Sequence, residues 1–446
     1  MEDIMAGDDI QVSMSFWYAF QEILESTWWT RVWTLQESIL APRSTVYYGL
    51  WSMPFSNLVS AVDNYAQHLG SCCLYIKPWH WLGPQEQLAL EKLIKEVYRI
   101  RMFHDLSFDT VDPWEETKRY PMWAVLRVLR SRSCWDARDR IYGLLGINRY
   151  NQRLSIATDY KSSVAEVYSK AFYQMLQEYP MDRGDLNPLV GSSFNSEVMG
   201  LPSWVPDFTA HLPDAAADWD HERAARAYFV YDASIGHQAE PILHQDHSLG
   251  LTGVMVDKVT QILSKPNVEL LEPGRSYWEE THQRLTNLKV QILNNPNFHP
   301  ELGPDAKEAR FWRAVTTEVV WDGGSGTYRR LDSEDLDELQ KWLSGVEEDV
   351  ERFFSPHGFP TILGATMNSR AMFLTAKGDL GVGPQDIRTG DEVWILFGGR
   401  VPFVLRSTPE NPVGSYLFIG DTYVGDIMWG DSLTGNMEAT RDIRLV

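Results

Sequence analysis

The C-terminal part of the chain is a series of short apolar segments that are interrupted by Gly and Asp. From residue 371 onward these segments read AMFLTA, DEVWILFG, VPFVLRS and SYLFIGDTYV. Short runs of β-branched and aromatic residues, separated by turn-forming residues, are typical of strands that are joined by tight turns. The pattern therefore predicts an antiparallel β unit over residues 366–446.

The first half of the chain has a helical pattern instead. Apolar residues recur at helical spacing in residues 15–41, 85–105, 121–133, 136–147 and 162–179. Strand-like segments such as LTGVMVDKVTQI follow in residues 225–265, and helical patterns return at 276–294, 306–321 and 333–354. We therefore expect an α+β fold in which a mainly helical body carries the C-terminal antiparallel β unit packed on it. The predicted regions are 1–50, 51–215, 216–365 and 366–446.

The charge balance restricts the partners of the chain. It has 40 Lys and Arg residues against 61 Asp and Glu residues, so its formal net charge is −21. Phosphate backbones and anionic lipid surfaces repel such a chain, so we expect neither nucleic acid nor a membrane as partner. A protein or an apolar small molecule remains as the expected partner.

Several features indicate a cytoplasmic protein. No apolar run approaches the length of about 18 residues that a membrane-spanning helix needs. The acidic start MEDIMAGDDI is unlike a signal peptide. The three cysteines, Cys72, Cys73 and Cys134, do not have the number or spacing of a disulfide framework, which fits a reducing compartment.

Sequence motifs that bind cofactors are missing from the chain. It contains no GxGxxG, GxxxxGK[ST], HExxH or CxxC motif, so we expect no nucleotide and no metal. A loop with His237, His244 and His247 fits a polar turn better than a metal site. An acidic set resembles a magnesium site, but a structural role is favoured for it as well; it consists of Asp214, Asp218 and Asp220.

Two groups of charged residues beside large apolar side chains provide the candidate site residues. Arg31 and Glu37 flank a Trp-rich helical segment, and Asp139 opens an otherwise apolar one. Opposite charges in such surroundings favour hydrogen-bonded ion pairs that fix the packing of neighbouring segments. The alternative is that Glu37 or Asp139 acts as a general acid or base.

Landmarks in a fixed order resemble the fungal heterokaryon-incompatibility (HET) family. TRVWTLQESILAPRSTVYYG is similar to the segment that closes the HET domain, with Arg31, Trp33, Gln36 and Glu37 at its R-x-W-x-x-Q-E positions. CWDARDRIYGLLGI, TDYKSSVAEVY, LPSWVPDF and FWRAVTTEVVW match landmarks that follow it in the family. The segments at 377–406 and 416–431 are similar to the family's C-terminal β unit.

The chain departs from the family at its N-terminal end. HET domains begin with strand motifs like Y-x-A-L-S-Y-x-W-G and L-W-I-D-x-[LI]-C-I-N-Q, and neither occurs here. Residues 1–50 thus resemble a remnant, the C-terminal part of a HET domain. The resemblance implies that the α/β core of the domain is missing, so no catalytic residue carries over from it.

Two functions are compatible with these observations. The resemblance implies a protein of self/non-self recognition, or of its regulation, that acts through protein contacts. The alternative is a cofactor-independent enzyme of fungal secondary metabolism, such as a Diels–Alder-type cyclase, that folds an apolar substrate in an aromatic-lined pocket. The 18 Trp, 19 Tyr and 18 Phe residues allow such a pocket, although core packing explains most of them. The sequence leaves the oligomeric state open.

Overall fold

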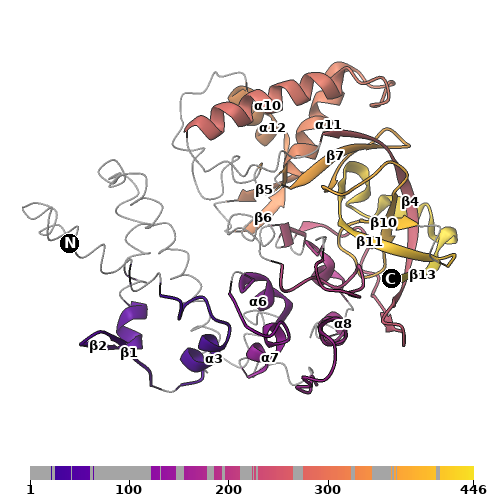
Figure 1. Cartoon of the computed structure of the whole chain (residues 1–446). Coiled ribbons are helices and arrows are strands. Elements are labelled where there is room, and N and C mark those ends of the chain that lie inside the picture. The colour runs from indigo at the N-terminus through magenta and orange to yellow at the C-terminus, as the bar shows by residue number, and fades with distance from the viewer. Residues whose placement is uncertain are drawn as a thin grey trace, which may run out of the picture. The chain divides into compact units, whose positions relative to one another are not determined.

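The computed structural model divides the chain into two compact units, Met1–Gln152 and Arg153–Val446, which are considered separately (Figure 1). The structure describes residues 22, 26–41, 43–60, 64, 122–130, 132–146, 155–177, 185–192, 196–210, 223–224, 226–227, 230–264, 275–322, 327–343, 363, 366–367, 369–407 and 412–446. The helix that was predicted over 85–105 and most of 15–25 lie outside these residues, as do Cys72, Cys73 and the acidic set at 214–220.

The first unit contains the helices α3 (Trp33–Ile39), α6 (Met122–Val128) and α7 (Asp139–Leu145). Helix α3 packs against α7. Gly143 permits this close approach, since a Cβ atom at its position would lie 2.6 Å from Cγ1 of Val32. The N–H of Val32 also donates to the carbonyl of Ser133 at 3.0 Å, which ties the start of α3 to the segment between α6 and α7.

A β-hairpin follows α3 in the same unit. Strands β1 (Thr45–Tyr48) and β2 (Trp51–Pro54) pair antiparallel. Gly49 in their connection has φ 58°, a left-handed conformation that glycine adopts without strain. The base of the hairpin packs through Val46 on a small apolar cluster, which consists of Trp29, Phe55, Leu58 and Val59.

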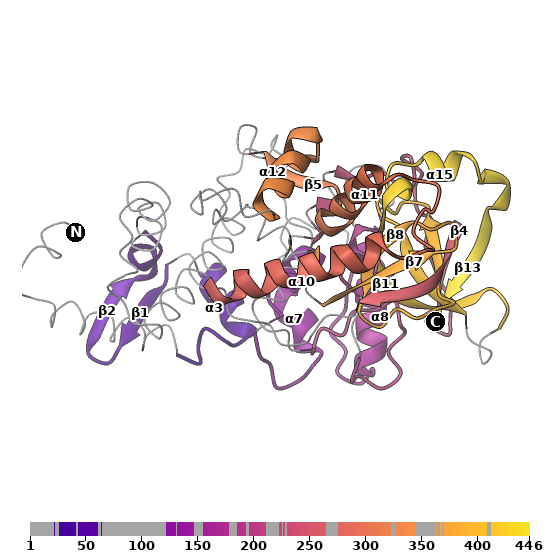
Figure 2. The same ribbon diagram turned by 90° about the horizontal axis from the view of Figure 1, so that it is seen from above.

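Among the described residues, the second unit contains four longer helices. They are α8 (Val164–Gln177), α10 (Arg275–Leu293), α11 (Pro304–Thr316) and α12 (Ser333–Leu343). Helix α8 buries Phe172 beside Trp204, with 6.1 Å between the ring centroids. Helix α11 packs on strand β8, and α10 packs on α11 (Figure 2).

The other described elements of the second unit are strands and short helical turns. Its strands are β3 (Ile242–Leu243), β4 (Leu249–Ser264), β5 (Val319–Asp322), β6 (Thr327–Arg330), β7 (Arg370–Thr375), β8 (Leu380–Pro384), β9 (Glu392–Leu396), β10 (Phe403–Ser407), β11 (Ser415–Asp421), β12 (Tyr423–Val424) and β13 (Arg441–Leu445). Its short helical turns are η3 (Asn187–Leu189), η4 (Gly425–Ile427), α15 (Asp431–Thr434) and η5 (Met437–Ala439). Strands β5 and β6 form a separate hairpin.

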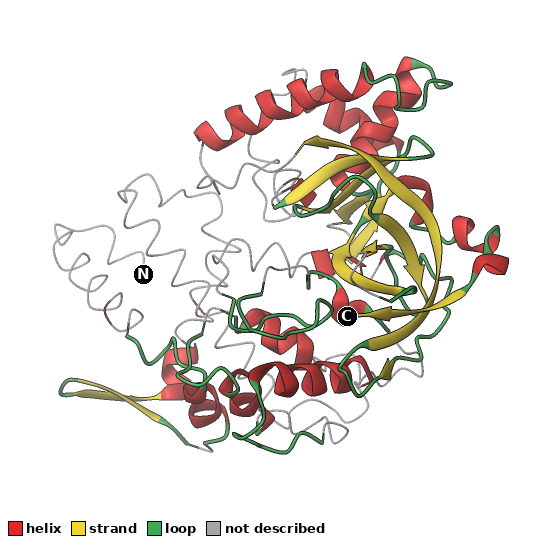
Figure 3. Cartoon of the chain, turned by 45° about the vertical axis from the view of Figure 1, so that its right-hand side comes forward, coloured by secondary structure: helices red, strands yellow, loops and turns green. Residues whose placement is uncertain are grey.

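Five strands of this unit close a barrel in the order β4–β13–β11–β10–β9 and back to β4 (Figure 3). All neighbours in the ring are antiparallel except β11 and β13, which pair parallel. Burial alternates at the start of β4 and at the end of β13, whereas β9 and β10 are buried along most of their length. The core around the barrel includes Val254, Ile395 and Val404, each fully buried.

Strand β4 belongs to the barrel and to a sheet that extends from it. Its first residues pair with β13 and β9, whereas Val259 to Ser264 pair with β7. The register shifts between Met255 and Asp257 and again between Val259 and Gln261. Such bulges bend a strand and increase its twist, which allows β4 to leave the ring and continue with β7, β8 and β12.

The α+β class that the sequence predicted is confirmed, but the mainly helical body is not supported. Strands contribute comparably to helices among the described residues. The predicted helical body is reduced because β4, which lies before the C-terminal region, is part of the same sheet as the C-terminal strands. The C-terminal unit is also not purely antiparallel, because β13 returns to pair parallel with β11. Within the described ranges, every helix is too short or too polar to span a lipid bilayer.

Candidate functional site

Asp139, one of the predicted site residues, joins two helices of the first unit. Its Oδ2 atom accepts a hydrogen bond of 3.1 Å from Nε1 of Trp33, which lies on α3. Gln36 on the same helix donates to the carbonyl of Tyr142 at 3.4 Å. Asp139 stands in the first turn of α7, where a carboxylate also interacts favourably with the helix dipole. These contacts fix α3 against α7.

The two other predicted site residues have exposed side chains. Arg31 precedes α3 by two residues, Glu37 lies within the helix, and both side chains face solvent. The backbone of Arg31 is used structurally, since its carbonyl accepts from Nη1 of Arg132 at 3.3 Å. The structure therefore brings Asp139 to Trp33 rather than to Arg31 or Glu37. The role of Glu37 or Asp139 as a general acid or base stays a prediction.

The histidine-rich loop forms a turn, as expected. The N–H of His247 donates to the carbonyl of His244 at 3.0 Å, and His247 has φ 61°. The ring of His237 stacks on Phe397 with 4.6 Å between centroids. In the part of the chain that the structure describes, no group of three or more His, Cys, Asp or Glu residues is arranged to hold a metal ion.

The second unit has a polar cluster at one end of the barrel, which we call the barrel-end cluster. It consists of the buried residues Gly191, Tyr231, Arg370 and Asp421 and of the partly buried Asp185 and Arg400. Nη2 of Arg370 donates to Oδ2 of Asp421 at 2.9 Å and to its carbonyl at 2.7 Å. The N–H of Gly191 donates to the other carboxylate oxygen at 2.8 Å. Burial raises the pKa of Asp421, but Arg370, Arg223 and this N–H lower it by more, so that it lies below its usual value.

Asp185 lies in the segment that covers this end of the barrel. The N–H of the following residue, Leu186, donates to the carbonyl of Gly398 in the β9–β10 connection at 2.9 Å. Burial raises the pKa of Asp185 to about 6, although the Asn187 N–H and Arg400 act in the opposite direction. Nη1 of Arg400 in turn donates to the carbonyl of Tyr231 at 3.3 Å. The carboxyl of Asp185 is therefore the titrating group of the cluster near neutral pH.

Glu318 is a second buried carboxylate, next to the barrel-end cluster. Thr317 and Glu318 have φ 52° and 59°, an uncommon left-handed pair that turns the chain from α11 into β5. The Glu318 side chain accepts hydrogen bonds from Nε1 of Trp429 at 2.9 Å, from Nη2 of Arg330 at 3.3 Å and from Arg313. The guanidinium of Arg330 also lies 4.3 Å from the centroid of the Trp429 ring.

Two buried tyrosines lie between these carboxylates. Tyr231 donates its hydroxyl hydrogen to the Thr317 carbonyl, and its ring lies 5.5 Å from Trp429. Burial raises the pKa of both Tyr231 and Tyr423 above the usual tyrosine value. Chemically, the arrangement holds distant segments of the second unit together through charge-assisted hydrogen bonds.

His299 joins further elements of the second unit. Its Nε2 atom lies 2.9 Å from Oδ1 of Asp379, and its Nδ1 atom lies 2.7 Å from Oε1 of Glu301. Arg310 on α11 reaches Asp426 at 2.9 Å and Asp379 at 3.6 Å. This network links the loop after α10 and helix α11 to the β7–β8 connection and to η4.

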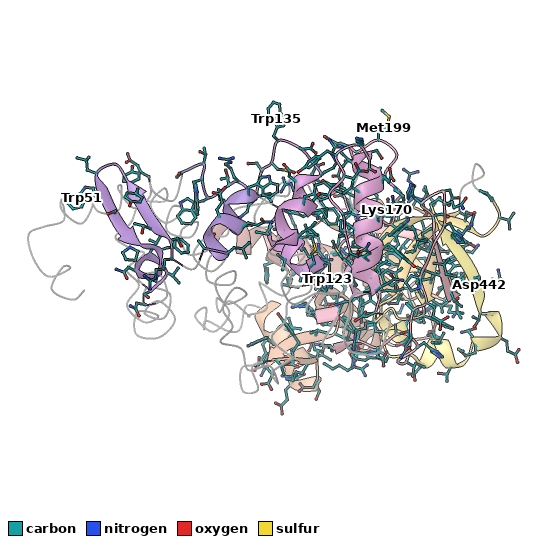
Figure 4. All side chains as sticks on the ribbon, turned by 90° about the horizontal axis from the view of Figure 1, so that it is seen from below. Trp51, Trp123, Trp135, Lys170, Met199 and Asp442 are labelled. Carbon is teal, nitrogen blue, oxygen red and sulfur yellow. The ribbon has the colours of Figure 1, made fainter. Side chains whose placement is uncertain are left out.

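The β1–β2 hairpin carries a group of exposed apolar side chains. The exposed fractions are 76% for Tyr47, 80% for Trp51 and 104% for Leu50, and Tyr48 and Met53 are also exposed. Trp135, which is also fully exposed, lies apart from this group on the segment between α6 and α7 (Figure 4). Gathered apolar side chains on a surface mark an interaction site more often than single ones do.

Comparison with known proteins shows which proteins the chain is similar to. Residues 316–446 match the family model of the Het-6 beta-barrel domain. The chain is also 22% identical over 467 residues to heterokaryon incompatibility protein 6, OR allele, of Neurospora crassa. The chain is a relative of the HET family. The alignment covers 93% of this HET relative and 66% of the Neurospora protein, so the chain spans slightly less than two thirds of that protein's length. No solved structure matches it.

The barrel of this HET relative uses residues from outside the matched region. The match to the barrel family begins at residue 316, whereas the ring closes only through β4 at Leu249–Ser264. The barrel-end cluster likewise needs Asp185 and Gly191. Asp185, Gly191 and strand β4 therefore belong structurally with the C-terminal barrel.

Sequence reasoning did not identify the buried ion pair or Glu318. One signal was available for the ion pair, because Arg370 begins the apolar strand RAMFLT and Asp421 ends the strand SYLFIGD. A charge at each end of a buried strand requires a partner. No comparable local signal precedes Glu318, whose burial follows from the left-handed turn at the end of α11.

Proposed function

We propose that this HET relative acts in the cytoplasm in self/non-self recognition between fungal cells, or in its regulation, through contacts with other proteins. The supporting observation is the similarity to heterokaryon incompatibility protein 6, which extends over 93% of the chain. A heterokaryon incompatibility protein acts when genetically different cells fuse, so a relative of it is expected to meet other proteins at that event.

The exposed apolar side chains of the β1–β2 hairpin support the proposal that the chain acts through contacts with other proteins. Aromatic residues such as Tyr47 and Trp51 are enriched at the centres of protein interfaces, where they contribute much of the binding energy. The net charge of −21 disfavours nucleic acid and leaves proteins as the fitting macromolecular partner. The hairpin is therefore the proposed contact surface.

The alternative function, a cofactor-independent cyclase, has no comparable support. The large aromatic residues Trp204, Trp312 and Trp394 are fully buried in the core of the second unit, as expected for packing. The charged groups of the barrel-end cluster are engaged with one another or with backbone groups.

Heterokaryon formation tests the proposed function. The gene is deleted in its own host, and the deletion strain and its parent are each paired with strains of differing compatibility. We expect at least one incompatible pairing to become compatible, measured as survival of fused compartments that exclude a vital dye. Unchanged outcomes in all pairings, together with a metabolite profile that loses one cyclised product, would replace the proposal with the cyclase.

A further inference from the structure

One backbone edge of the hairpin has no pairing partner among the residues that the structure describes. Strand β1 pairs only with β2 among the described residues. The N–H of Phe55 donates to the carbonyl of Ser44 at 2.9 Å. Hydrogen-bonded pairs recur at every second residue of an antiparallel ladder, so Val46 also directs its backbone groups toward β2. Thr45 and Tyr47 therefore direct their N–H and C=O groups to the edge away from β2.

The other edge of the hairpin is less suited to pairing. The residues of β2 that face outward in the same register are Ser52 and Pro54. Proline has no N–H, so this edge lacks a donor at Pro54. Natural edge strands are commonly protected by Lys, Pro or a covering segment, and β1 contains neither Lys nor Pro. The β1 edge is the one that can accept a complete strand.

The charge of the chain indicates which strand fits there. Residues 44–55 contain no Asp, Glu, Lys, Arg or His, although the net charge is −21. Two copies of this chain repel each other wherever their acidic surfaces approach, and they repel least where two uncharged surfaces meet. The hairpin strands offer such a surface, with Trp51 and Tyr47 exposed on opposite faces. A described carboxylate, Glu22, contacts them near the turn, where its Oε2 atom accepts from the Tyr48 hydroxyl at 2.6 Å.

We propose that two copies of the chain associate through their β1 edges, antiparallel, with Val46 of each copy at the centre. Thr45 of one copy then lies opposite Tyr47 of the other, and each of these residues both donates and accepts a backbone hydrogen bond. A two-fold axis repeats the same contacts on both sides, which is the usual symmetry of homodimers. The two hairpins form one sheet in the order β2–β1–β1–β2.

The side chains fit this register. Residues opposite each other across an antiparallel pair share a face, so Val46, Tyr48, Trp51 and Met53 of both copies line one face of the combined sheet. Val46 already packs on the cluster around Trp29 in each copy. The dimer thus extends an apolar core that exists in the single chain.

This inference rests on the proposed mode of action, contact between proteins, but not on a role in incompatibility. Self-association is measured on the purified full-length chain, whereas the role is measured by heterokaryon formation. A dimer without any effect on heterokaryon formation contradicts only the role. A monomer that still controls heterokaryon formation contradicts only the inference drawn here.

Sedimentation velocity of the full-length chain, at about 0.1 to 100 μM, tests the dimer. We expect a monomer–dimer equilibrium that shifts toward dimer when ionic strength rises from about 0.02 to about 0.5 M, because salt screens the repulsion between the two acidic chains. A chain that stays monomeric over this whole range overturns the proposal.

Two proline variants provide a matched comparison of the edges. Tyr47→Pro removes an N–H from the β1 edge, and Ser52→Pro removes one from the β2 edge; neither removes a hydrogen bond within the hairpin. We expect Tyr47→Pro to raise the dissociation constant about tenfold or more and Ser52→Pro to leave it unchanged. Equal effects of both variants, with unchanged circular dichroism, overturn the β1 register. If instead only a strand peptide of another protein bound at β1 and the chain itself stayed monomeric, the occupant would be a different protein.

Discussion

Arg370 at the start of β7 and Asp421 at the end of β11 form an ion pair of 2.9 Å, and the side chain of each is less than a tenth exposed. The pair connects the extension sheet with the barrel, and the Gly191 N–H adds the segment that covers the barrel end. Both charged groups lose their hydration on folding and interact with each other instead. Removal of one partner therefore leaves the other charge buried without compensation.

Arg370→Met should therefore lower the free energy of unfolding by about 3–5 kcal/mol, measured by urea denaturation. The double variant Arg370→Met/Asp421→Leu should recover part of this loss, because no unpaired charge then remains. Lys170→Met is the control: its ion pair with Glu166 is exposed and should contribute less than about 1 kcal/mol. A loss for Arg370→Met no larger than that of the control would contradict the assignment of the buried pair.

Asp185→Asn should stabilise the chain at pH 7.5 but not at pH 4. The pKa of Asp185 is raised to about 6 in the folded chain, against about 3.9 in the unfolded chain. The folded state therefore binds more protons between these values, and its stability falls as pH rises from about 4 to about 6. The variant should gain about 1–3 kcal/mol above pH 6 while its Oδ1 atom still accepts the Asn187 N–H. The difference from the parent chain is measured by urea denaturation at both pH values, and a pH-independent difference would refute the explanation.

Asp139→Ala should loosen the contact between α3 and α7. It removes the acceptor of the Trp33 indole and a favourable charge in the first turn of α7, together about 1–2 kcal/mol. Hydrogen exchange of α3 amides should accelerate accordingly. Glu37→Ala changes an exposed carboxylate and should alter stability by less than about 0.5 kcal/mol. The reverse ranking of the two variants would show that Glu37, not Asp139, fixes this helix pair.

Gly143→Ala should destabilise the first unit by about 1–3 kcal/mol, since the new Cβ would lie 2.6 Å from Cγ1 of Val32. Val32→Ala in the same chain should remove the clash and recover part of the loss. At Gly435, which has φ −78° and no atom within 4 Å of a built Cβ, the same substitution should be neutral or slightly stabilising. Thermal unfolding compares the three variants, and a neutral Gly143→Ala would mean that α3 and α7 do not approach this closely.

The sequence was sufficient for local structure but not for the pairing of distant strands. The alternating pattern at 251–262 predicts a strand, and β4 is found there. The strands that β4 pairs with could not be predicted, since Thr252 pairs with Asp442 and Val254 with Ile395, far along the chain. Periodicity within a segment does not specify which remote strand it joins, so the closed barrel and the parallel β11–β13 pair were not predicted.

In the candidate site, too, local features were predictable from the sequence and contacts between distant segments were not. Asp139 was a candidate from its residue type and apolar surroundings, and Trp33 and Gln36 were matched through the resemblance to the HET family. The structure joins Asp139 to Trp33 and Gln36 to the Tyr142 carbonyl by hydrogen bonds. The barrel-end cluster could not be found in this way, because Gly191 and Asp421 meet only through the closure of the barrel. Likewise, the exposure of Trp51 follows from a two-stranded sheet with no further described strand beside it, which no local pattern reveals.

The most direct test of the account is complementation of the deletion strain in an incompatible pairing. The parent chain, Trp51→Ser and Trp135→Ser are expressed at equal abundance; both variants lose a strongly exposed tryptophan, but only Trp51 belongs to the hairpin. Dye uptake in fused compartments is measured for each. We expect the parent chain and Trp135→Ser to restore the incompatible outcome and Trp51→Ser to fail to restore it. Full restoration by Trp51→Ser would contradict recognition through the hairpin.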